Sequence, residues 1–428
     1  MFKEITYNIF NKYTCRLCFK YKYYSLSSTI TNQCSLPDLN FSYLCDPANT
    51  EKIKNDIKKR KGRGDINKVI KLHKDWLNSF DNNKDFLKSE LIRAALKIPN
   101  ISHSEISHLE EEPTVVREIG KLPKEVPFKY LTFEEIADNF NLCRTDVSNF
   151  TGSRSYYLLD QLALLEQALI KYTLFKLKEL NFSLLSVPDI LPRNIIEMCG
   201  METKGERNQV YTLDQSKWND LCLSGTAEMG IAYYLSNIKL LDKKFPLKIA
   251  AVSRCFRAET SKIAEEKGIY RVHQFTKVEM FGISSPSQSD SLLNEFVQIQ
   301  EDLFTSLGLV LRTLDMPPHE LGAQAARKFD VEGWLPGKKK WGELSSASNC
   351  TDYQSRRLGI TSKDSYLHTI NGTACAIPRL IIALLETYQK EDGRVVLPEV
   401  LEPFLGFRNI SQCRFPKPSV FKIHQRFR

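Results

Sequence analysis

The sequence has no run of eighteen apolar residues, so a membrane-spanning helix is not expected and no membrane partner is predicted. It also lacks the patterns GxGxxG and GxxxxGK followed by Ser or Thr, which argues against a Rossmann or P-loop nucleotide site. No internal repeat is visible. With 428 residues, 42% of them apolar, the chain can bury a sizeable core and is expected to hold more than one domain.

Paired cysteines are also scarce. Of the eleven cysteines, Cys15 and Cys18 form the only CxxC, and no second pair completes a zinc site. Because a tetrahedral metal needs four ligands, a structural zinc is not expected. Free thiols in a reducing compartment explain the scattered cysteines better.

Acidic residues are nearly absent from the first 36 residues, where Glu4 is the only one. The same segment carries five basic residues and a Ser/Thr-rich run over 25–31. This composition is typical of a mitochondrial transit segment, with the basic N-terminus of a cytosolic protein as the alternative. We predict a transit segment over 1–36 and a location in the mitochondrial matrix.

The formal net charge of +9 is compatible with an acidic partner such as nucleic acid, although solubility alone accounts for it. Ten basic residues and few acidic ones lie between Lys52 and Lys74. A solvated helix face and a salt-dependent contact with a phosphate backbone both explain this stretch.

Apolar residues at helical spacing predict three short helices before residue 100. The first opens at Asp46, which is followed by a proline, and ends near Gly62. The next two, over 65–80 and then up to Leu96, form an antiparallel hairpin with arms of about fifteen residues, roughly 22 Å long. Residues 101–150 are polar with several prolines and predict a linker into a second domain.

Helices and strands alternate from residue 152 onward. Because the strands arrive as hairpins with few βαβ crossovers, the pattern predicts an α+β fold, with an antiparallel sheet flanked by helices. The predicted strands lie at 182–190 (broken at Pro188), 209–213, 247–256, 269–282, 309–315 and 327–334, and the predicted helices at 158–180 and 374–388.

One predicted hairpin carries the most informative side chains. Arg257 and Glu259 stand two apart at the end of an apolar run, and Phe275, Lys277 and Glu279 alternate on one face of the returning strand. A guanidinium suits phosphate, an aromatic ring stacks on a base, and carboxylates accept amine or hydroxyl donors. The pattern predicts an ATP site beside a small polar substrate, with a cross-strand salt bridge as the structural alternative.

Three other segments fit the same chemistry. Thr226 and Glu228 follow Gly225, where backbone can approach a ligand, so they suit a substrate ammonium. Taken alone, the triplet is explained better by a surface turn. Glu343 and Ser346 supply oxygen ligands that Mg²⁺ accepts together with phosphate oxygens, although a Ser-rich stretch alone is usually a turn.

The last segment is Asn371-Gly372-Thr373, which leads into the buried helix that Arg379 opens. An arginine there either packs or projects into a site.

Together these segments resemble the class II aminoacyl-tRNA synthetases, specifically seryl-tRNA synthetases of the mitochondrial type. The resemblance covers 105–406, and more loosely 37–104. The matching segments are 226–228 (the family's serine-binding loop), 255–259 with 272–279 (motif 2), 345–357 (the segment before motif 3) and 371–379 (motif 3).

The resemblance implies a serine–tRNA ligase with three catalytic residues, Arg257, Glu279 and Arg379. It implies that L-serine is bound by Thr226, Ala227, Glu228, Glu279 and Thr373. It implies that ATP is bound by Arg257, Ala258, Glu259, Val272, Phe275, Glu343, Leu344, Ser345, Ser346 and Arg379. In this assignment Arg257 holds the α-phosphate and Arg379 the γ-phosphate, Phe275 stacks on adenine, and Glu343 and Ser346 ligate Mg²⁺.

Two departures from the family stand out. Members usually carry a long coiled-coil arm that grips tRNA and serves the active site of the other subunit, whereas this chain has only the short hairpin. The resemblance therefore implies tRNA(Ser) as partner and a dimer, either a homodimer or a heterodimer with an armed paralogue. In motif 1, Asn181 stands where glycine is frequent, while Pro188 is in place.

The domain boundaries expected from this resemblance are 37–104 for a helical domain with a truncated arm, 105–407 for the catalytic domain, and 408–428 for a basic tail that contacts RNA or is disordered. Two other functions remain open at this point: a catalytically silent paralogue acting as a binding or regulatory subunit, and a ligase that uses another acceptor.

Overall fold

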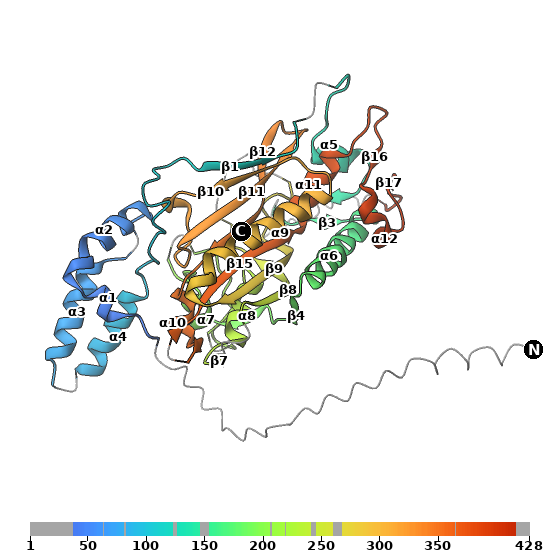
Figure 1. Cartoon of the computed structure of the whole chain (residues 1–428). Helices are drawn as coiled ribbons and strands as arrows, with labels where there is room; N and C mark the ends of the chain where they lie inside the picture. The colour runs from blue at the N-terminus through green and yellow to red at the C-terminus, as the bar shows by residue number, and fades with distance from the viewer. Residues whose placement is uncertain are drawn as a thin grey trace, which may run out of the picture. The chain divides into compact units, whose positions relative to one another are not determined.

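The computed structural model describes residues 37–416, except for 63, 81–82, 123–125, 146–153, 206–207, 219, 241–244, 260–267 and 364 (Figure 1). The predicted transit segment 1–36 and residues 417–428 lie outside the described residues. Within the described ranges, no helix combines the length and apolarity needed to cross a membrane.

An eight-stranded sheet forms the centre of the fold (Figure 1). Every neighbouring pair is antiparallel except β4 and β8. This confirms the predicted antiparallel α+β architecture and the pairing of the two motif 2 strands. The order is β1 (Thr114–Ile119), β10 (Leu311–Asp315), β11 (Arg327–Leu335), β12 (Lys340–Asn349), β15 (His368–Ala376), β9 (Gln274–Ser284), β8 (Leu247–Phe256) and β4 (Ser183–Ser186).

Helices bury both faces of this sheet. The helices α6 (Gln161–Glu179), α9 (Ser289–Ser306) and α11 (Ile377–Thr387) share one core with Met280 of β9. The helices α7 (Arg193–Met198) and α8 (Ala227–Tyr234) share another with Phe281 of the same strand. Since successive residues of a strand point to opposite faces, the two cores lie on opposite sides of the sheet.

The remaining elements connect and border these layers. They are α5 (Phe133–Asn139), α10 (Tyr353–Leu358), α12 (Glu402–Leu405), β2 (Cys143–Arg144), β3 (Tyr157–Leu158), β5 (Ile190–Pro192), β6 (Leu221–Leu223), β7 (Lys239–Leu240), β13 (Thr361–Ser362), β14 (Ser365–Tyr366), β16 (Val395–Val396) and β17 (Asn409–Ile410), with short 3₁₀ turns η5 (Pro286–Gln288), η6 (Pro318–Glu320) and η7 (Glu399–Leu401).

The N-terminal helices have a small core of their own, which includes Ile53, Val69 and Leu91. They are α1 (Phe41–Leu44), η1 (Pro47–Asn49), α2 (Thr50–Lys59), α3 (Ile66–Asn78) and α4 (Lys84–Ala95). The predicted hairpin is confirmed as α3 and α4, with arms of 13 and 12 residues. Asp46 accepts a hydrogen bond from the Ala48 amide at 2.9 Å and so caps η1, as its position before a proline predicted.

A buried arginine fastens this helical part to the rest of the chain. Arg60 is 4% exposed, and its Nη1 donates to the carbonyls of Asn100 at 2.6 Å and Ala325 at 2.8 Å. Its Nη2 donates to the carbonyl of Gly322. Asn100 continues the contact, because its amide nitrogen donates to the carbonyls of Gln324 and Cys350, both at 2.8 Å.

Several sequence-based predictions are wrong in detail. Residues 101–150 are not simply a linker: β1 forms one edge of the main sheet, and α5 buries Phe133 and Ile136 in the core. The edge strand is exposed along most of its length, which explains why its sequence shows no apolar alternation. At 209–213 the structure has only an isolated bridge between Thr212 and Cys222.

Other boundaries shift for identifiable reasons. The strand predicted at 182–190 divides into β4 and β5 on either side of Pro188, since proline cannot donate to a ladder. The first part of the predicted tail belongs to the body of the fold, because β17 pairs with β16 and Cys413 is buried in the core. Asn181 has φ 64°, the left-handed conformation that favours glycine and that asparagine tolerates.

Candidate active site

A cavity of about 110 Å³ brings most of the predicted nucleotide-binding residues together. From the predicted set it is lined by Arg257, Glu259, Val272, Phe275, Glu343, Leu344, Ser345, Ser346, Thr373 and Arg379. These side chains come from β9, β12, β15 and α11 and from the connection between β8 and β9, so segments more than a hundred residues apart in sequence meet at one place.

A β-bulge explains how Glu343 and Ser346 reach the same face. On a regular strand, residues three apart point to opposite sides. Here Val331 pairs with Ser345 but Glu332 pairs with Glu343, so Leu344 is the extra residue of a bulge. Gly333 leaves the room for it, because a Cβ at that position would lie 2.6 Å from Leu344 Cδ1. The stretch predicted as a possible turn is therefore a strand, β12, with an irregularity that assembles a carboxylate and a hydroxyl.

Glu343 and Ser346 could ligate Mg²⁺ only together with other ligands. Among the described residues there is no group of three or more His, Cys, Asp or Glu side chains placed to hold a metal ion. Asp330, opposite Ser346 on β11, is buried, and its Oδ1 has no partner within the described part of the chain. Its Oδ2 accepts from Lys328 at 2.9 Å. A magnesium ion here would rely on phosphate oxygens and water to complete its six ligands.

Arg379 projects into the cavity from the first turn of α11. Its Nη1 lies 2.9 Å from Glu343 Oε1, and its guanidinium stacks 4.8 Å from the centre of the Tyr270 ring. The Tyr270 hydroxyl donates to the Glu343 carbonyl at 3.2 Å, and burial raises the pKa of this phenol to about 12. Arg379 thus projects into the site, the second of the two possibilities that the sequence left open.

Arg257 faces Phe275 across the same cavity, with its guanidinium carbon 5.3 Å from the ring centre. Its Nη2 lies 3.5 Å from the Gly225 carbonyl, and its buried Nε has no hydrogen-bond partner among the described residues. Glu259 pairs with Arg271 at 3.3 Å. The cross-strand salt bridge considered as the alternative is therefore present for Glu259, which reaches the returning segment before β9, whereas Arg257 faces Phe275 in the cavity.

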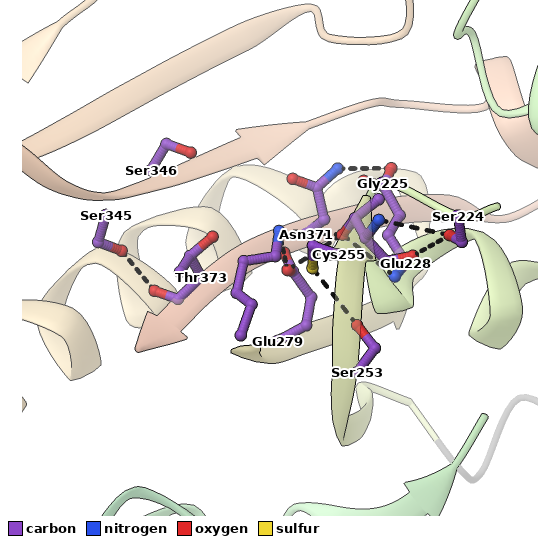
Figure 2. Close-up of polar contacts among 12 residues, drawn as sticks. Ser224, Gly225, Glu228, Ser253, Cys255, Glu279, Ser345, Ser346, Asn371 and Thr373 are labelled. Atoms are coloured by element: carbon purple, nitrogen blue, oxygen red, sulfur yellow. Dashed lines mark hydrogen bonds and ion pairs between the residues drawn. The ribbon is translucent and has the colours of Figure 1, made fainter. Parts of the chain in front are cut away.

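Next to this cavity, three polar side chains form a buried cluster. Thr226 Oγ1 donates to Glu279 Oε2 at 3.1 Å and accepts from Lys277 Nζ at 3.0 Å, and Lys277 also forms an ion pair with Glu279. Thr373 is the register partner of Glu279 on β15. Figure 2 shows Glu279 between Thr373 and Ser345 on one side and Asn371 and Glu228 on the other.

Thr226 and Glu228 are not on a surface turn. Thr226 is the N-cap of α8, and Glu228 is 7% exposed in its first turn. Burial, and then the neighbouring carboxylate of Glu279, raise the pKa of Glu228 to about 7. The amide nitrogens of Gln354 and Asn371 donate to Glu228 Oε1 at 2.6 and 2.8 Å and favour its ionised form. A cationic ligand would favour that form further.

Five predicted residues do not line the cavity: Thr226, Glu228 and Glu279 lie beside it, whereas Ala227 and Ala258 direct no side chain to the site. Ala227 packs in the core beneath α8, and the Ala258 amide donates to the Gln209 carbonyl at 2.9 Å. Conversely, the sequence assigned no role to Lys277, Gln354 or Asn371. The alternation of Lys277 with Phe275 and Glu279 was a usable signal, whereas nothing in the local sequence placed Gln354 beside Glu228.

Comparison with known sequences identifies the fold and its relatives. The tRNA synthetase class II core domain (G, H, P, S and T) matches residues 211–388. The mitochondrial serine–tRNA ligase of Mus musculus is 43% identical over 334 residues, which cover 76% of this chain and 64% of that protein. This chain therefore spans less than two thirds of that relative. The serine–tRNA ligase of Treponema denticola is 38% identical over 331 residues, covering 75% of this chain and 78% of that protein.

A solved structure points to the same family as the sequence relatives. Seryl-tRNA synthetase from Pyrococcus horikoshii, complexed with ATP, superposes with a TM-score of 0.77 at 29% identity, covering 86% of this chain and 98% of that one. Identity above 30% over more than two thirds of a bacterial relative, together with this fold, assigns the family. The chain belongs to the seryl-tRNA synthetases, within the class II aminoacyl-tRNA synthetases.

Proposed function

We propose that this chain is a serine–tRNA ligase, which activates L-serine with ATP to seryl-adenylate and transfers the seryl group to the 3′ end of mitochondrial tRNA(Ser). The observation that carries the proposal is the arrangement of Arg257, Phe275, Glu343 and Arg379 around one cavity that borders the Thr226, Lys277 and Glu279 cluster. The Pyrococcus horikoshii relative was solved with ATP, which supports ATP as the nucleotide.

For the first step, a serine carboxylate oxygen attacks the α-phosphorus of ATP, and pyrophosphate leaves. Such a reaction needs positioning and charge neutralisation more than covalent help from the protein. Arg257, with an unpartnered buried Nε, is the residue we assign to the α-phosphate, and Phe275 is assigned to adenine. We assign Arg379 to the γ-phosphate, where it would exchange its contact with Glu343 for a phosphate oxygen.

Magnesium is proposed to bind Glu343 and Ser346, which the bulge at Leu344 places on one face. When bound, the ion would screen the negative charge of the phosphates. The chain itself contributes the two oxygen ligands, and the Glu343 carboxylate becomes available to the ion when Arg379 turns from it to the γ-phosphate.

Serine is proposed to bind with its ammonium near Glu228 and its hydroxyl near Glu279 and Thr373. A site that pairs the substrate hydroxyl discriminates against alanine, because alanine would leave the buried Glu279 short of a donor. Transfer then follows when a ribose hydroxyl of the terminal adenosine of tRNA attacks the seryl carbonyl and AMP leaves.

Location and assembly are also proposals. The mitochondrial relatives and the composition of residues 1–36 support the mitochondrial matrix. A dimer, either of two copies or with an armed paralogue, is supported by exposed apolar side chains on and after α6: Leu164, Phe175, Leu180, Leu184 and Ile190. We expect the boundary at 104/105 to separate the helical domain with its truncated arm from the catalytic domain, while β17 and the buried Cys413 keep the residues just after the expected 407/408 boundary with the catalytic domain.

The test is serine-dependent exchange of pyrophosphate into ATP by the purified chain, followed by charging of mitochondrial tRNA(Ser). Arg257→Gln should lower the exchange rate by about 100-fold or more, because a fixed cation at the reacting phosphate is lost. Arg312→Gln is the matched control, since Arg312 pairs with Glu332 and is not part of the cavity wall.

Retention of all these side chains disfavours a silent paralogue. Whether charging of tRNA needs a partner subunit is tested separately. Exchange without charging would indicate that a partner subunit supplies the grip on tRNA. Absence of exchange in the wild-type chain, alone and with an armed paralogue, would leave the silent subunit as the better account. Charging of a carrier protein in place of tRNA would identify a ligase with another acceptor.

A further inference from the structure

A buried amide of α10 donates a hydrogen bond to Glu228. Gln354 is 0% exposed, and its Nε2 donates to Glu228 Oε1 at 2.6 Å. The other end of the same amide accepts from the Thr369 hydroxyl at 2.8 Å. Thr369 lies on β15 and is also fully buried. One side chain therefore links α10, β15 and the first turn of α8.

The direction of the Gln354 amide is set by its surroundings. Its Nε2 also lies 3.4 Å from the carbonyl oxygen of Cys199, and a backbone carbonyl can only accept. If the amide were reversed, its oxygen would face both that carbonyl and the Glu228 carboxylate. The NH₂ group of Gln354 therefore faces Glu228 whether the Glu228 carboxyl group is ionised or protonated.

Asn371 approaches the same carboxylate oxygen from β15, at 2.8 Å (Figure 2). Because both amides reach Oε1, an incoming ammonium would meet the other oxygen, Oε2. The remaining titratable groups that interact with Glu228 are Glu279 and Lys277 on β9, Cys199 after α7, and Cys350 after β12.

We propose that Gln354 is a positioning residue for the amino-acid substrate: anchored by Thr369 and the Cys199 carbonyl, it fixes Oε1 of Glu228 and turns Oε2 toward the substrate ammonium. This inference rests on the proposed function, because it assumes that Glu228 receives the ammonium of serine. Gln354 would not touch the substrate. Substitution of Gln354 would therefore change the affinity for serine and not the affinity for ATP, because Gln354 does not line the nucleotide cavity.

The test is Gln354→Met, which keeps the length of the side chain and removes the donors. Binding of L-serine, measured by titration calorimetry, should weaken by about tenfold or more at pH 7.5, since a buried donor to a charged group is lost. The KM for ATP in pyrophosphate exchange should stay within about twofold of the wild-type value. In addition, the fall of serine affinity on acidification should begin at a higher pH in the variant, because Glu228 loses a donor that favours its ionised form.

Ser355→Ala is the matched control, because it changes a neighbouring buried residue of α10 whose hydroxyl has no partner within the described residues. It should leave serine affinity and its pH profile unchanged. Thr369→Val provides a second variant if Gln354→Met does not fold: it removes only the anchor of the amide, and a smaller loss of the same kind is expected.

Equal weakening of serine and ATP, or an unshifted pH profile in both variants, would overturn the positioning role. An unchanged affinity for serine in Gln354→Met would also overturn the positioning role, but it would not contradict the proposed ligase function. If the wild-type chain itself neither binds serine nor exchanges pyrophosphate, the proposed function fails, and this inference fails with it.

Discussion

At the scale of single residues, the ionisation of Glu228 connects stability to substrate binding. Its pKa of about 7 in the folded chain is well above the usual value for a glutamate, first because the group is buried and second because Glu279 is near. A cation bound there must find the carboxylate ionised. Binding of serine should therefore release a proton at pH values below about 7.

The first prediction follows from that linkage. The KM for serine should rise as the pH falls below about 7, approaching tenfold per pH unit, because protonated Glu228 no longer attracts an ammonium. Pyrophosphate exchange measured from pH 5.5 to 8.5 at saturating ATP checks this. A KM that is flat over the whole range would show that Glu228 does not change its charge when serine binds.

The second prediction concerns Glu228→Gln. Because the folded-state pKa is raised above that of the unfolded chain, the stabilisation from Glu228 is fully present at low pH and is lost as the pH rises through about 7. At pH 8 the uncharged variant should melt a few degrees higher than the wild type, while its KM for serine rises by about 100-fold. Calorimetry at pH 8 and at pH 5 separates the effects, since the gain in melting temperature should disappear at pH 5.

Residues also show where sequence reasoning reaches its limit. The motif pattern anticipated that Arg257, Phe275, Glu343 and Arg379 share a site, because each lies in a segment with a family signature. Gln354 lies within such a segment, 345–357, but no local pattern distinguishes a buried amide that meets Glu228, 126 positions earlier in the chain, from an exposed one. Only the packing of α10 against β15 reveals that contact.

At the scale of elements, the bulge in β12 is the feature that assembles the proposed magnesium ligands. The sequence indicated two oxygen ligands three residues apart but favoured a turn, because the stretch is rich in serine. A regular strand would place the two residues on opposite faces. Gly333 and Leu344 resolve the conflict, since the missing side chain of one accommodates the extra residue at the other. Likewise, β1 was predicted as linker because an edge strand with little buried surface has no apolar alternation.

The third prediction tests the bulge. Gly333→Ala would place a Cβ 2.6 Å from Leu344 Cδ1 and should displace Leu344 and, with it, Glu343. Half-saturation by Mg²⁺ in pyrophosphate exchange should shift upward by about threefold to tenfold, with a stability loss of about 1–3 kcal/mol. Gly342→Ala, on the facing strand, contacts the end of Leu335 instead and should cost stability without changing the Mg²⁺ requirement.

The fourth prediction concerns the anchor of the N-terminal helices. Arg60→Leu leaves the carbonyls of Asn100, Ala325 and Gly322 without their donor and should destabilise the chain by about 2–4 kcal/mol. Cleavage within α2 under native conditions should become faster than in the wild type. Lys58→Leu, on the exposed side of the same helix, is the control and should change neither measurement. Unchanged cleavage in Arg60→Leu would mean that the helical core alone holds this part in place.

At the scale of the whole molecule, the two edges of the main sheet differ in what they offer a second chain. The edge at β4 exposes Leu184 and lies beside apolar side chains of α6, among them Phe175. The opposite edge, β1, exposes Val115 and Val116 together with Thr114, Arg117 and Glu118. A continuous apolar area favours burial in an assembly.

The fifth prediction uses this contrast. Leu184→Glu should convert the proposed dimer to a monomer at micromolar concentration, as measured by sedimentation velocity, because a charge would be buried in the interface. Val116→Glu, at the other edge, should sediment as the wild type does. A wild-type chain that is already monomeric, but associates with an armed paralogue in a manner sensitive to Leu184, would favour the heterodimer.

The attachment of the short hairpin carries a consequence for how this architecture can vary in length. The hydrogen bonds of Arg60 and Asn100 all lie at the base of the helical part, whereas Phe80, at the end of α3, is 94% exposed. Residues can therefore be added or removed beyond Asn78 without disturbing the junction with the sheet. Grafting a longer coiled coil between α3 and α4 should yield a chimera whose serine activation is unaltered and whose affinity for tRNA alone changes.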